Sequence, residues 1–373
     1  MKLEVMGMAE NIIDPFGTST VYDYDRLFAD LGLKPIDKNI LSRIRSPSRF
    51  LRRGIDFAHI DFDKFVEASK NKKGVAVMTG IKPTNEFHLG SKMSAEEVIY
   101  FQKEFGAKVF YAVADLEGMI DNGLSLEDQE KIAVDNVADL LALGLDPKNA
   151  YIYRQSRERR VMNMAYTFSR KVTNNHLKNL YGDRPFGLYF SALTQCGDML
   201  LPQLPEFGGP KTVLVPVGVD QAPHIFLCRD IASKLADSHD FKPVAGIFHK
   251  FFRSLKGESK MSKRDPSSTL TLNDSPEAAR KKIIGALTGG QKTVAEQREL
   301  GGDLDKSVVF ELYKYHFVED DKKVEKVAKA YASGKLLDGE MKDEIAEIVV
   351  KFLEKHQAKK RKMVPKARKI LSD

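Results

Sequence analysis

The chain has 373 residues, of which 42% are hydrophobic and 30% charged, and its formal net charge is +7. This length allows two or three domains with a large core, in a protein of globular composition. No apolar run approaches the roughly 18 residues of a membrane span, and the N-terminus lacks a signal-peptide pattern. Cys196 and Cys228 have no close Cys or His partner. We therefore expect a protein of the reducing cytoplasm without membrane association, disulfide framework or metal site.

The first 73 residues form a mixed, basic N-terminal extension, after which short apolar runs alternate with helical patterns. Ser94 with Glu97 predicts a capped start for an amphipathic helix that ends at Gly106. Ser125 with Asp128 opens a second helix. The apolar runs at 75–78, 108–114, 150–153 and 213–217 are expected to be buried strands. Strands separated by helices predict an α/β fold over residues 74–270, with a parallel sheet covered on both faces.

Residues 271–373 have helical patterns throughout. Asp274, Ser275 and Pro276 predict a helix start, because proline suits the first helical position and the acid lies beside the positive helix end. Further helical patterns continue to the C-terminus. We expect a separate all-helical domain.

The positive charge is concentrated at the end of this helical part. From Lys355 onward there are eight Lys or Arg residues and one acid, Asp373, so the segment carries +7 (8 − 1) and the rest of the chain sums to zero. A neutral body with a basic tail favours contact with a polyanion, and nucleic acid is the first candidate. A solvated helix end that only aids solubility is the alternative.

The segment TGIKPTNEFHLGS, residues 79–91, lies where the first predicted strand of the sheet gives way to a helix. In open α/β sheets, anionic ligands bind at this place against backbone N–H groups of the helix start. Gly80 and Gly90 allow close approach of the backbone, and His88 is suited to donate a hydrogen bond to a phosphate oxygen. Taken alone, the His-x-Gly element is equally compatible with a capping or packed histidine.

The segment GESKMSKRDPSSTL, residues 257–270, is a charged loop that holds Met261 between Lys260 and Lys263. Charged loops normally exclude apolar side chains. The methionine therefore indicates a segment that packs down in one state and carries its two cations to a defined place.

His-Leu-Gly after the first strand, followed by Lys-Met-Ser-Lys after the last strand, resembles the two-part signature of class I aminoacyl-tRNA synthetases. Nearly the whole chain is similar to the tryptophanyl-tRNA synthetases of the archaeal and eukaryotic cytosolic type, most specifically LTGGQKTVAEQRELGGDLDKSVVF at 287–310. The resemblance implies a Rossmann-like catalytic domain with an inserted helical segment at about 115–205. It also implies that residues 271–373 form an anticodon-binding domain.

The reaction implied by this resemblance is the ATP-dependent activation of L-tryptophan to tryptophanyl-adenylate, with Mg²⁺, followed by transfer to tRNA(Trp). His88, Lys260 and Lys263 would be catalytic, and the lysines would neutralise charge on the pyrophosphate leaving group. Met261 would pack to hold the closed loop. The implied ATP-binding residues are Thr79, Gly80, His88, Gly90, Ser91, Gly218, Asp220, Lys260, Met261, Ser262 and Lys263.

The segments ALTQCGDMLL and VPVGVDQAPH match the family's amino-acid site. Gln195 and Asp198 lie three apart on one helix face. An acid at the position of Asp198 meets the substrate's phenol or indole N–H in tyrosyl and bacterial tryptophanyl enzymes. Gly218 and Asp220 would face the ATP ribose and Gln221 the α-amino group, while Asp115 and Glu117 match an acidic cluster near the amino acid. The implied amino-acid pocket is Met78, Glu117, Gln195, Asp198 and Gln221.

Several positions depart from the family pattern. Met78 and Ala112 stand where archaeal and eukaryotic members have polar residues that read the indole N–H, so we expect Asp198 to take that role. Ser91 replaces the second histidine of the first motif, and Lys92 is a candidate for compensating charge. Arg264 replaces the final serine of the loop pattern, which is a common variant.

Family members are homodimers, with the interface expected at about 115–205. A tyrosyl-tRNA synthetase is one alternative, favoured by Gln195 with Asp198 and disfavoured by Met78. A non-catalytic RNA-binding paralogue is another, suggested by Ser91. A nucleotidyltransferase acting on a small molecule would share the His-x-Gly element but would need neither the helical domain nor the basic tail.

Overall fold

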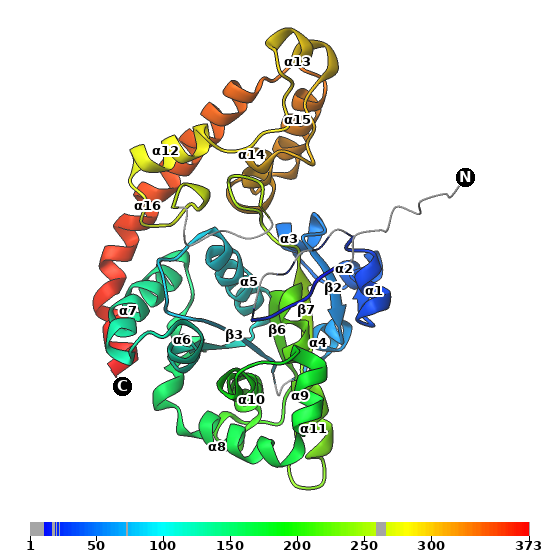
Figure 1. Ribbon diagram of the computed structural model, residues 1–373, viewed down its shortest axis with the longest axis vertical. Coiled ribbons are helices and arrows are strands. Elements are labelled where there is room, and N and C mark those ends of the chain that lie inside the picture. Colours follow the sequence, from blue (N-terminus) through cyan, green and yellow to red (C-terminus); the bar gives the residue numbers. More distant parts are fainter. Residues whose placement is uncertain are drawn as a thin grey trace.

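The structure is a computed structural model that describes residues 11–16, 19, 21, 23–71, 74–258 and 266–372. A seven-stranded sheet with the strand order β1-β2-β7-β6-β3-β4-β5 lies at its centre (Figure 1). The strands are β1 (Lys34–Pro35), β2 (Asp56–Ile60), β3 (Ala76–Ile81), β4 (Lys108–Val113), β5 (Ala150–Arg154), β6 (Val213–Gly218) and β7 (Ala245–His249).

Neighbouring strands from β7 to β5 are parallel, which confirms the α/β fold predicted from the alternating pattern. Strands β1 and β2 add antiparallel pairs at the β7 edge, so the first 73 residues contribute to the same sheet. The register places Ile81 beside Val113, and Gly218 beside His249. The carboxyl ends of these strands therefore meet at one edge, where ligands bind in open α/β sheets.

Side chains on the two faces of the sheet enter two separate core clusters. Val77 and Val109 belong to one cluster, whereas their neighbours Met78 and Phe110 belong to the other. This alternation follows from the two-residue period of a strand, and burial on both faces explains the continuous apolar runs in the sequence. Helices cover both faces. Those up to residue 234 are α1 (Arg26–Asp30), α2 (Lys38–Ser42), α3 (Arg49–Arg52), α4 (Phe62–Ala68), α5 (Leu89–Phe105), α6 (Asp115–Asn122), α7 (Leu126–Leu143), α8 (Arg159–Phe168), α9 (Asn174–Tyr181), α10 (Phe186–Leu200) and α11 (Ala222–Lys234).

Helix α5 begins earlier than the sequence predicts. Its N-cap is His88, whose Nδ1 accepts hydrogen bonds from the backbone N–H groups of Gly90 and Ser91. Ser94 and Glu97 lie inside the helix, and the Ser94 hydroxyl donates to the Gly90 carbonyl. The predicted capping box at Ser94 is wrong because an imidazole, which is outside the usual set of capping side chains, satisfies the first turn.

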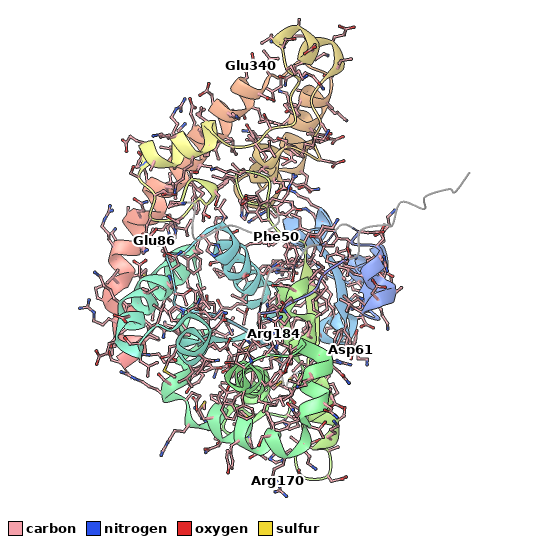
Figure 2. All side chains as sticks on the ribbon, viewed as in Figure 1. Phe50, Asp61, Glu86, Arg170, Arg184 and Glu340 are labelled. Carbon is pink, nitrogen blue, oxygen red and sulfur yellow. The ribbon has the colours of Figure 1, made fainter. Side chains whose placement is uncertain are left out.

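The C-terminal part of the chain is helical, as predicted, and extends away from the sheet as an elongated arm (Figure 1). Phe50, labelled in Figure 2, lies in the core cluster that the N-terminal region shares with this arm. The arm contains α12 (Pro276–Ile284), α13 (Val294–Leu300), α14 (Val308–Glu311), a π-helix (Leu312–Phe317), α15 (Asp321–Ala332) and α16 (Asp338–Ser372).

Helix α16 carries the basic tail and returns along the catalytic part, so that its C-terminal end lies beside α7 (Figure 1). Lys360 of the tail is buried, and its ammonium group donates hydrogen bonds to Asp135 and Asp139 of α7. Lys360 therefore anchors the helix, while neighbours such as Lys359 and Arg361 are exposed. Within the described part of the chain, no helix combines the length and apolarity needed to cross a membrane.

Candidate active site

Two adjoining cavities lie at the carboxyl edge of the parallel strands. The larger has a volume of about 900 Å³ and the smaller about 270 Å³. Gly80, Lys82 and Gly218 are among the residues that line both, so the two cavities are continuous with each other. Two molecules that react with each other could therefore occupy one site.

The first predicted motif and the residues that follow the lysine loop meet at the larger cavity. The backbone N–H of Leu89 donates to the carbonyl of Leu270 at 3.2 Å, and that of Leu272 donates to Phe87 at 2.8 Å. A β-bridge consequently joins His88 to Thr271, directly after the predicted lysine loop. Two segments about 180 residues apart in sequence are thus fixed side by side by backbone hydrogen bonds.

The predicted loop residues Lys260, Met261, Ser262, Lys263 and Arg264 lie outside the described residues. The residues that follow them do line the larger cavity, namely Pro266, Thr269 and Thr271.

His88 is placed where its chemistry is useful. Because Nδ1 accepts from Gly90 N–H at 3.1 Å and Ser91 N–H at 3.3 Å, the ring proton belongs on Nε2. Nε2 lies 3.4 Å from the Ser91 hydroxyl, and both residues line the larger cavity. An Nε2–H donor at the N-terminus of the 17-residue helix α5 gives this wall the character of an anion site.

Glycines shape the junction between the cavities. A side chain at Gly80 would place its Cβ 2.6 Å from the carbonyl oxygen of Ala112, and one at Gly218 would lie 2.6 Å from Asp220 Oδ1. Gly90, Gly218 and Asp220, which are among the predicted ATP contacts, line the larger cavity. Thr79 lines the smaller cavity instead, and its hydroxyl donates to the Pro216 carbonyl.

The five residues predicted for the amino-acid pocket all line the smaller cavity: Met78, Glu117, Gln195, Asp198 and Gln221. Asp198 accepts hydrogen bonds from Tyr153 OH at 2.7 Å and from Gln155 Nε2 at 2.5 Å. Glu117 accepts from the same Gln155 amide at 2.9 Å and from Gln195 at 2.7 Å. The two acids are therefore tied into one hydrogen-bond network.

Burial governs the protonation of these acids. It raises the pKa of Asp198 well above the ordinary value, and the hydrogen bonds from Tyr153 and Gln155 oppose this shift. Burial also raises the pKa of Glu117, against the effects of the nearby Lys82 charge and the two glutamine amides. The floor of the smaller cavity is thus a low-dielectric environment, in which a hydrogen bond to a polar group of a ligand would be strong.

Tyr153 and Gln155 were not predicted from the sequence. They lie at the end of β5 and in the short 3₁₀-helix Gln155–Arg157 that follows it. The only available signal was that Tyr153 ends a predicted strand and Gln155 follows it, because strands of a parallel sheet end at one edge. The Nε2 group of Gln155 donates to both acids, while its buried Oε1 has no hydrogen-bond partner among the described residues.

Two other predicted side chains point elsewhere. Asp115 is fully buried in an ion pair with Arg154 at 2.8 Å and accepts two hydrogen bonds from Ser156. Lys92 is fully buried, and its ammonium group donates to Glu96 and to the His316 carbonyl. The prediction that Lys92 supplies charge to the nucleotide is wrong, because its side chain joins α5 to the C-terminal arm.

A nucleotide-sized cavity at a helix start, continuous with a small buried polar pocket, is the arrangement of an enzyme that activates a small substrate with a nucleotide. Residues 70–354 match the family described as tRNA synthetases class I (W and Y), and the chain belongs to this family.

Named relatives and solved structures narrow the comparison. The chain is 40% identical to the tryptophan–tRNA ligase of Aeropyrum pernix, over 94% of this chain and 95% of the relative. It is 35% identical to that of Methanocaldococcus jannaschii, over 96% and 98%. The crystal structure of the tryptophanyl-tRNA synthetase from Aeropyrum pernix superposes with a TM-score of 0.90 at 39% identity, covering 96% of this chain and 98% of that one. The Encephalitozoon cuniculi enzyme bound to tryptophan superposes at 0.84 with 27% identity, over 94% and 98%.

Proposed function

We propose that the protein is a tryptophan–tRNA ligase, which activates L-tryptophan with ATP and transfers it to tRNA(Trp). The observation that carries this proposal is the backbone pairing of His88 with Thr271, which brings the first motif and the residues after the lysine loop to one cavity, beside the pocket that we propose for the amino acid. The names of the relatives support tryptophan as the amino acid.

In the first step, the carboxylate of tryptophan attacks the α-phosphorus of ATP, forming the adenylate and releasing pyrophosphate. No general base is needed, because the attacking carboxylate is already ionised. His88 and the start of α5 hold the phosphates, while Lys260 and Lys263 neutralise the charge that develops on the leaving pyrophosphate. Gly80, Gly90 and Gly218 let the backbone approach the nucleotide closely.

ATP would carry Mg²⁺ into the larger cavity. Glu86 and Asp220 line that cavity and offer the oxygen ligands that Mg²⁺ prefers, so the residues fit such an ion. When bound, the ion supplies neutralisation of phosphate charge.

Recognition of the indole would depend on the floor of the smaller cavity. Met78 and Ala112 line it, but the alanine has no side-chain acceptor for the indole N–H and the methionine thioether is only a weak one. Asp198 is the proposed acceptor, and Tyr153 and Gln155 hold its carboxylate in place. Gln221 and Glu117, which line the same cavity, are assigned to the α-amino group.

In the second step, a ribose hydroxyl of the terminal adenosine of tRNA attacks the adenylate carbonyl, and AMP leaves. We assign residues 74–270 to this chemistry, with the inserted segment at about 115–205, and residues 271–373 to anticodon recognition. The exposed lysines and arginines of α16 support contact with tRNA phosphates. Lys360 does not take part, because its ammonium group donates to Asp135 and Asp139.

A homodimer is supported by apolar side chains in the expected interface segment. Tyr166 of α8 and Phe186 of α10 are each 76% exposed, and Ile120 of α6 is 48% exposed. Large exposed apolar side chains mark interaction surfaces when they gather in one segment. Residues 1–73 would be the N-terminal extension, and we place the protein in the reducing cytoplasm, in keeping with its free Cys196 and Cys228.

The test is amino-acid-dependent ATP–pyrophosphate exchange, measured with tryptophan and with tyrosine in separate reactions, followed by charging of tRNA(Trp). Exchange with tryptophan alone supports the proposal and shows that Ser91 is tolerated. Exchange with tyrosine would make the protein a tyrosyl enzyme. Absence of exchange with either amino acid, with and without tRNA, would point to the non-catalytic RNA-binding alternative.

A further inference from the structure

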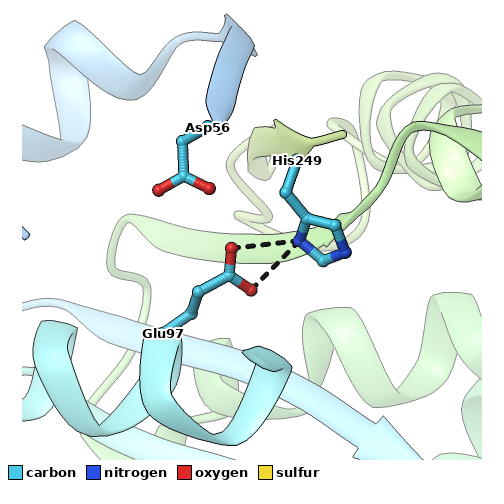
Figure 3. A group of neighbouring side chains, drawn as sticks. All are labelled: Asp56, Glu97 and His249. Atoms are coloured by element: carbon cyan, nitrogen blue, oxygen red, sulfur yellow. Dashed lines mark hydrogen bonds and ion pairs between the residues drawn. The ribbon is translucent and has the colours of Figure 1, made fainter. Parts of the chain in front are cut away.

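A second group of chemistry-bearing side chains lies behind the larger cavity. Asp56 comes from β2, Glu97 from α5 and His249 from the end of β7, and they are only 2%, 1% and 7% exposed. One potential ligand atom of each residue lies within 4.8 Å of the other two. Figure 3 shows the three side chains pointing toward one another from three different elements. Because these three residues are spread from position 56 to 249, no local spacing in the sequence predicts the cluster.

Buried acids elsewhere in the protein have ample hydrogen-bond donors. Asp115 is satisfied by Arg154 and Ser156. Asp139 accepts from the Lys360 ammonium group and lies 2.7 Å from His356 Nε2. A buried carboxylate needs such partners, since removing its charge from water without compensation costs several kcal/mol.

Asp56 and Glu97 differ from these acids. Glu97 has His249 Nδ1 at 3.0 and 3.1 Å from its two oxygens, while the buried Oδ1 of Asp56 has no hydrogen-bond partner among the described residues (Figure 3). In the described part of the chain, no lysine or arginine forms an ion pair with either acid. Burial disfavours the charged form of each group: it lowers the pKa of His249 and raises the pKa of Asp56 and of Glu97, the last to about 7.

We propose that Asp56, Glu97 and His249 bind a divalent transition-metal ion of the Zn²⁺ or Mn²⁺ type. Metal binding displaces the protons of its ligands, and two carboxylates with a neutral imidazole then carry a charge of −2, which one divalent cation neutralises. Oxygen and nitrogen donors together suit Zn²⁺ and Mn²⁺. The 3.0 Å separation of His249 Nδ1 and Glu97 is close to the roughly 3.0–3.4 Å between two ligands that each lie about 2.1 Å from one ion. The orphaned Asp56 oxygen becomes the third ligand.

Such an ion would connect the elements that build the nucleotide cavity. Strand β2 belongs to the N-terminal region, α5 begins at His88, and β7 precedes the segment that contains Lys260 and Lys263. His249 itself lines the cavity. The ion would therefore fix the wall of the larger cavity to which His249 contributes.

The test is metal stoichiometry of the full-length chain, freed of tags and stripped with EDTA. The protein is dialysed against Zn²⁺ or Mn²⁺ without ATP, and bound metal is counted by inductively coupled plasma mass spectrometry. We expect about one ion per chain for the wild type and a fall to background for Asp56→Asn and Glu97→Gln. Asp139→Asn is the matched control, since it alters another buried acid that contacts a histidine, and it should retain the ion.

A thermal-unfolding series covers the case in which a substitution weakens folding. The wild type and Asp139→Asn should gain several degrees in Tm with added Zn²⁺, because a ligand of the native state stabilises it, whereas Asp56→Asn should not. The proposal is overturned if the wild type binds no ion. It is also overturned if Asp56→Asn and Glu97→Gln keep the ion. In either case a proton shared between the two carboxyl groups accounts for the cluster.

Discussion

The two adjoining cavities are built in different ways. The larger is shaped by backbone, with Gly90 and Gly218 in its wall, the start of α5 at His88 and the paired segment at Thr271. The smaller is closed by a network of buried side chains centred on Asp198. Under the proposed function, nucleotide binding would depend on chain geometry and amino-acid binding on side-chain hydrogen bonds. Substitutions should separate the two functions, with expected effects on activation that decrease from the lysine loop to Lys92.

The largest effect is expected from the lysine loop. Lys263→Ala should lower the rate of adenylate formation on the order of 10²–10³-fold, because the lysine acts on charge that develops in the transition state. The affinity for tryptophan should stay within about twofold, since the amino acid occupies the other cavity. Single-turnover adenylation and equilibrium binding of tryptophan measure the two quantities. Equal losses in both would show that the lysine binds the ground state and that the two cavities are not functionally separate.

Gly80 tests the wall that both cavities share. Gly80→Ala would place a Cβ 2.6 Å from the Ala112 carbonyl, so β3 and β4 must move apart. We expect about 1–3 kcal/mol of lost stability and weaker binding of both ATP and tryptophan. Gly339→Ala is the control: its Cβ would meet nothing within 4 Å in the first turn of α16, and stability should rise slightly. Weakening of one ligand alone in Gly80→Ala would contradict a shared wall.

Selection of the indole can be tested with an analogue that has sulfur in place of the N–H, 3-benzothienylalanine. The ratio of kcat/KM for tryptophan to that for the analogue cancels effects common to both ligands. Asp198→Asn should lower this ratio about tenfold, because a charge-assisted hydrogen bond is lost. Gln155→Met should lower it less, since the amide only holds the carboxylate.

A buried amide outside the site provides the control for this selection. Gln102 donates to the carbonyls of Asp146 and Asn149, so Gln102→Met should destabilise the fold without changing the ratio. If the ratio fell more in Gln155→Met than in Asp198→Asn, the acceptor of the indole N–H would be Gln155 Oε1, which has no hydrogen-bond partner among the described residues. If the ratio stayed unchanged in both Asp198→Asn and Gln155→Met, the hydrogen-bond network around Asp198 would have no part in substrate selection.

The comparison also explains what the sequence could reveal. The order of strands and helices, the Ser125 cap and the Ser275 helix start were predicted and are confirmed, because local patterns determine them. The nucleotide wall could be anticipated in the same way, since glycines and a helix start are local features. Strands β1, β2 and β7 were missed, and β1 and β2 lie outside the alternation of strands and helices because they add antiparallel pairs at the β7 edge.

Side-chain networks escape such reasoning for a related reason. Gln155 and Asp198 are far apart in sequence, and nothing in either segment says that the amide donates to the acid. Asp56, Glu97 and His249 meet only because β2 adds antiparallel to β7, a pairing that the sequence pattern did not predict. A contact between three elements becomes visible only when the sheet order is known.

The smallest effect on activation is expected at Lys92, one residue after Ser91. Its ammonium group lies in the arm interface, with Glu96 at 2.7 Å and the His316 carbonyl at 3.0 Å, so Lys92→Met should leave the KM for ATP within about twofold. A rise in the KM for ATP above about fivefold would show that the charge of Lys92 contributes to nucleotide binding.

Stability is where Lys92 should matter, and its pH dependence has a definite sign. Burial lowers the pKa of Lys92 from 10.5 to about 8, so between these values the unfolded chain binds more protons than the folded one and stability rises with pH. The shift corresponds to about 3 kcal/mol as an order of magnitude. Lys92→Met has no amine at this position and so lacks this dependence on pH. From pH 8 to 10, the unfolding free energy of the wild type should therefore rise relative to that of Lys92→Met. Urea titration of both proteins measures this difference. A pH-independent difference would mean that the pKa of Lys92 is the same in the folded and the unfolded chain. The attraction of Glu96 for the ammonium group would then offset the effect of burial.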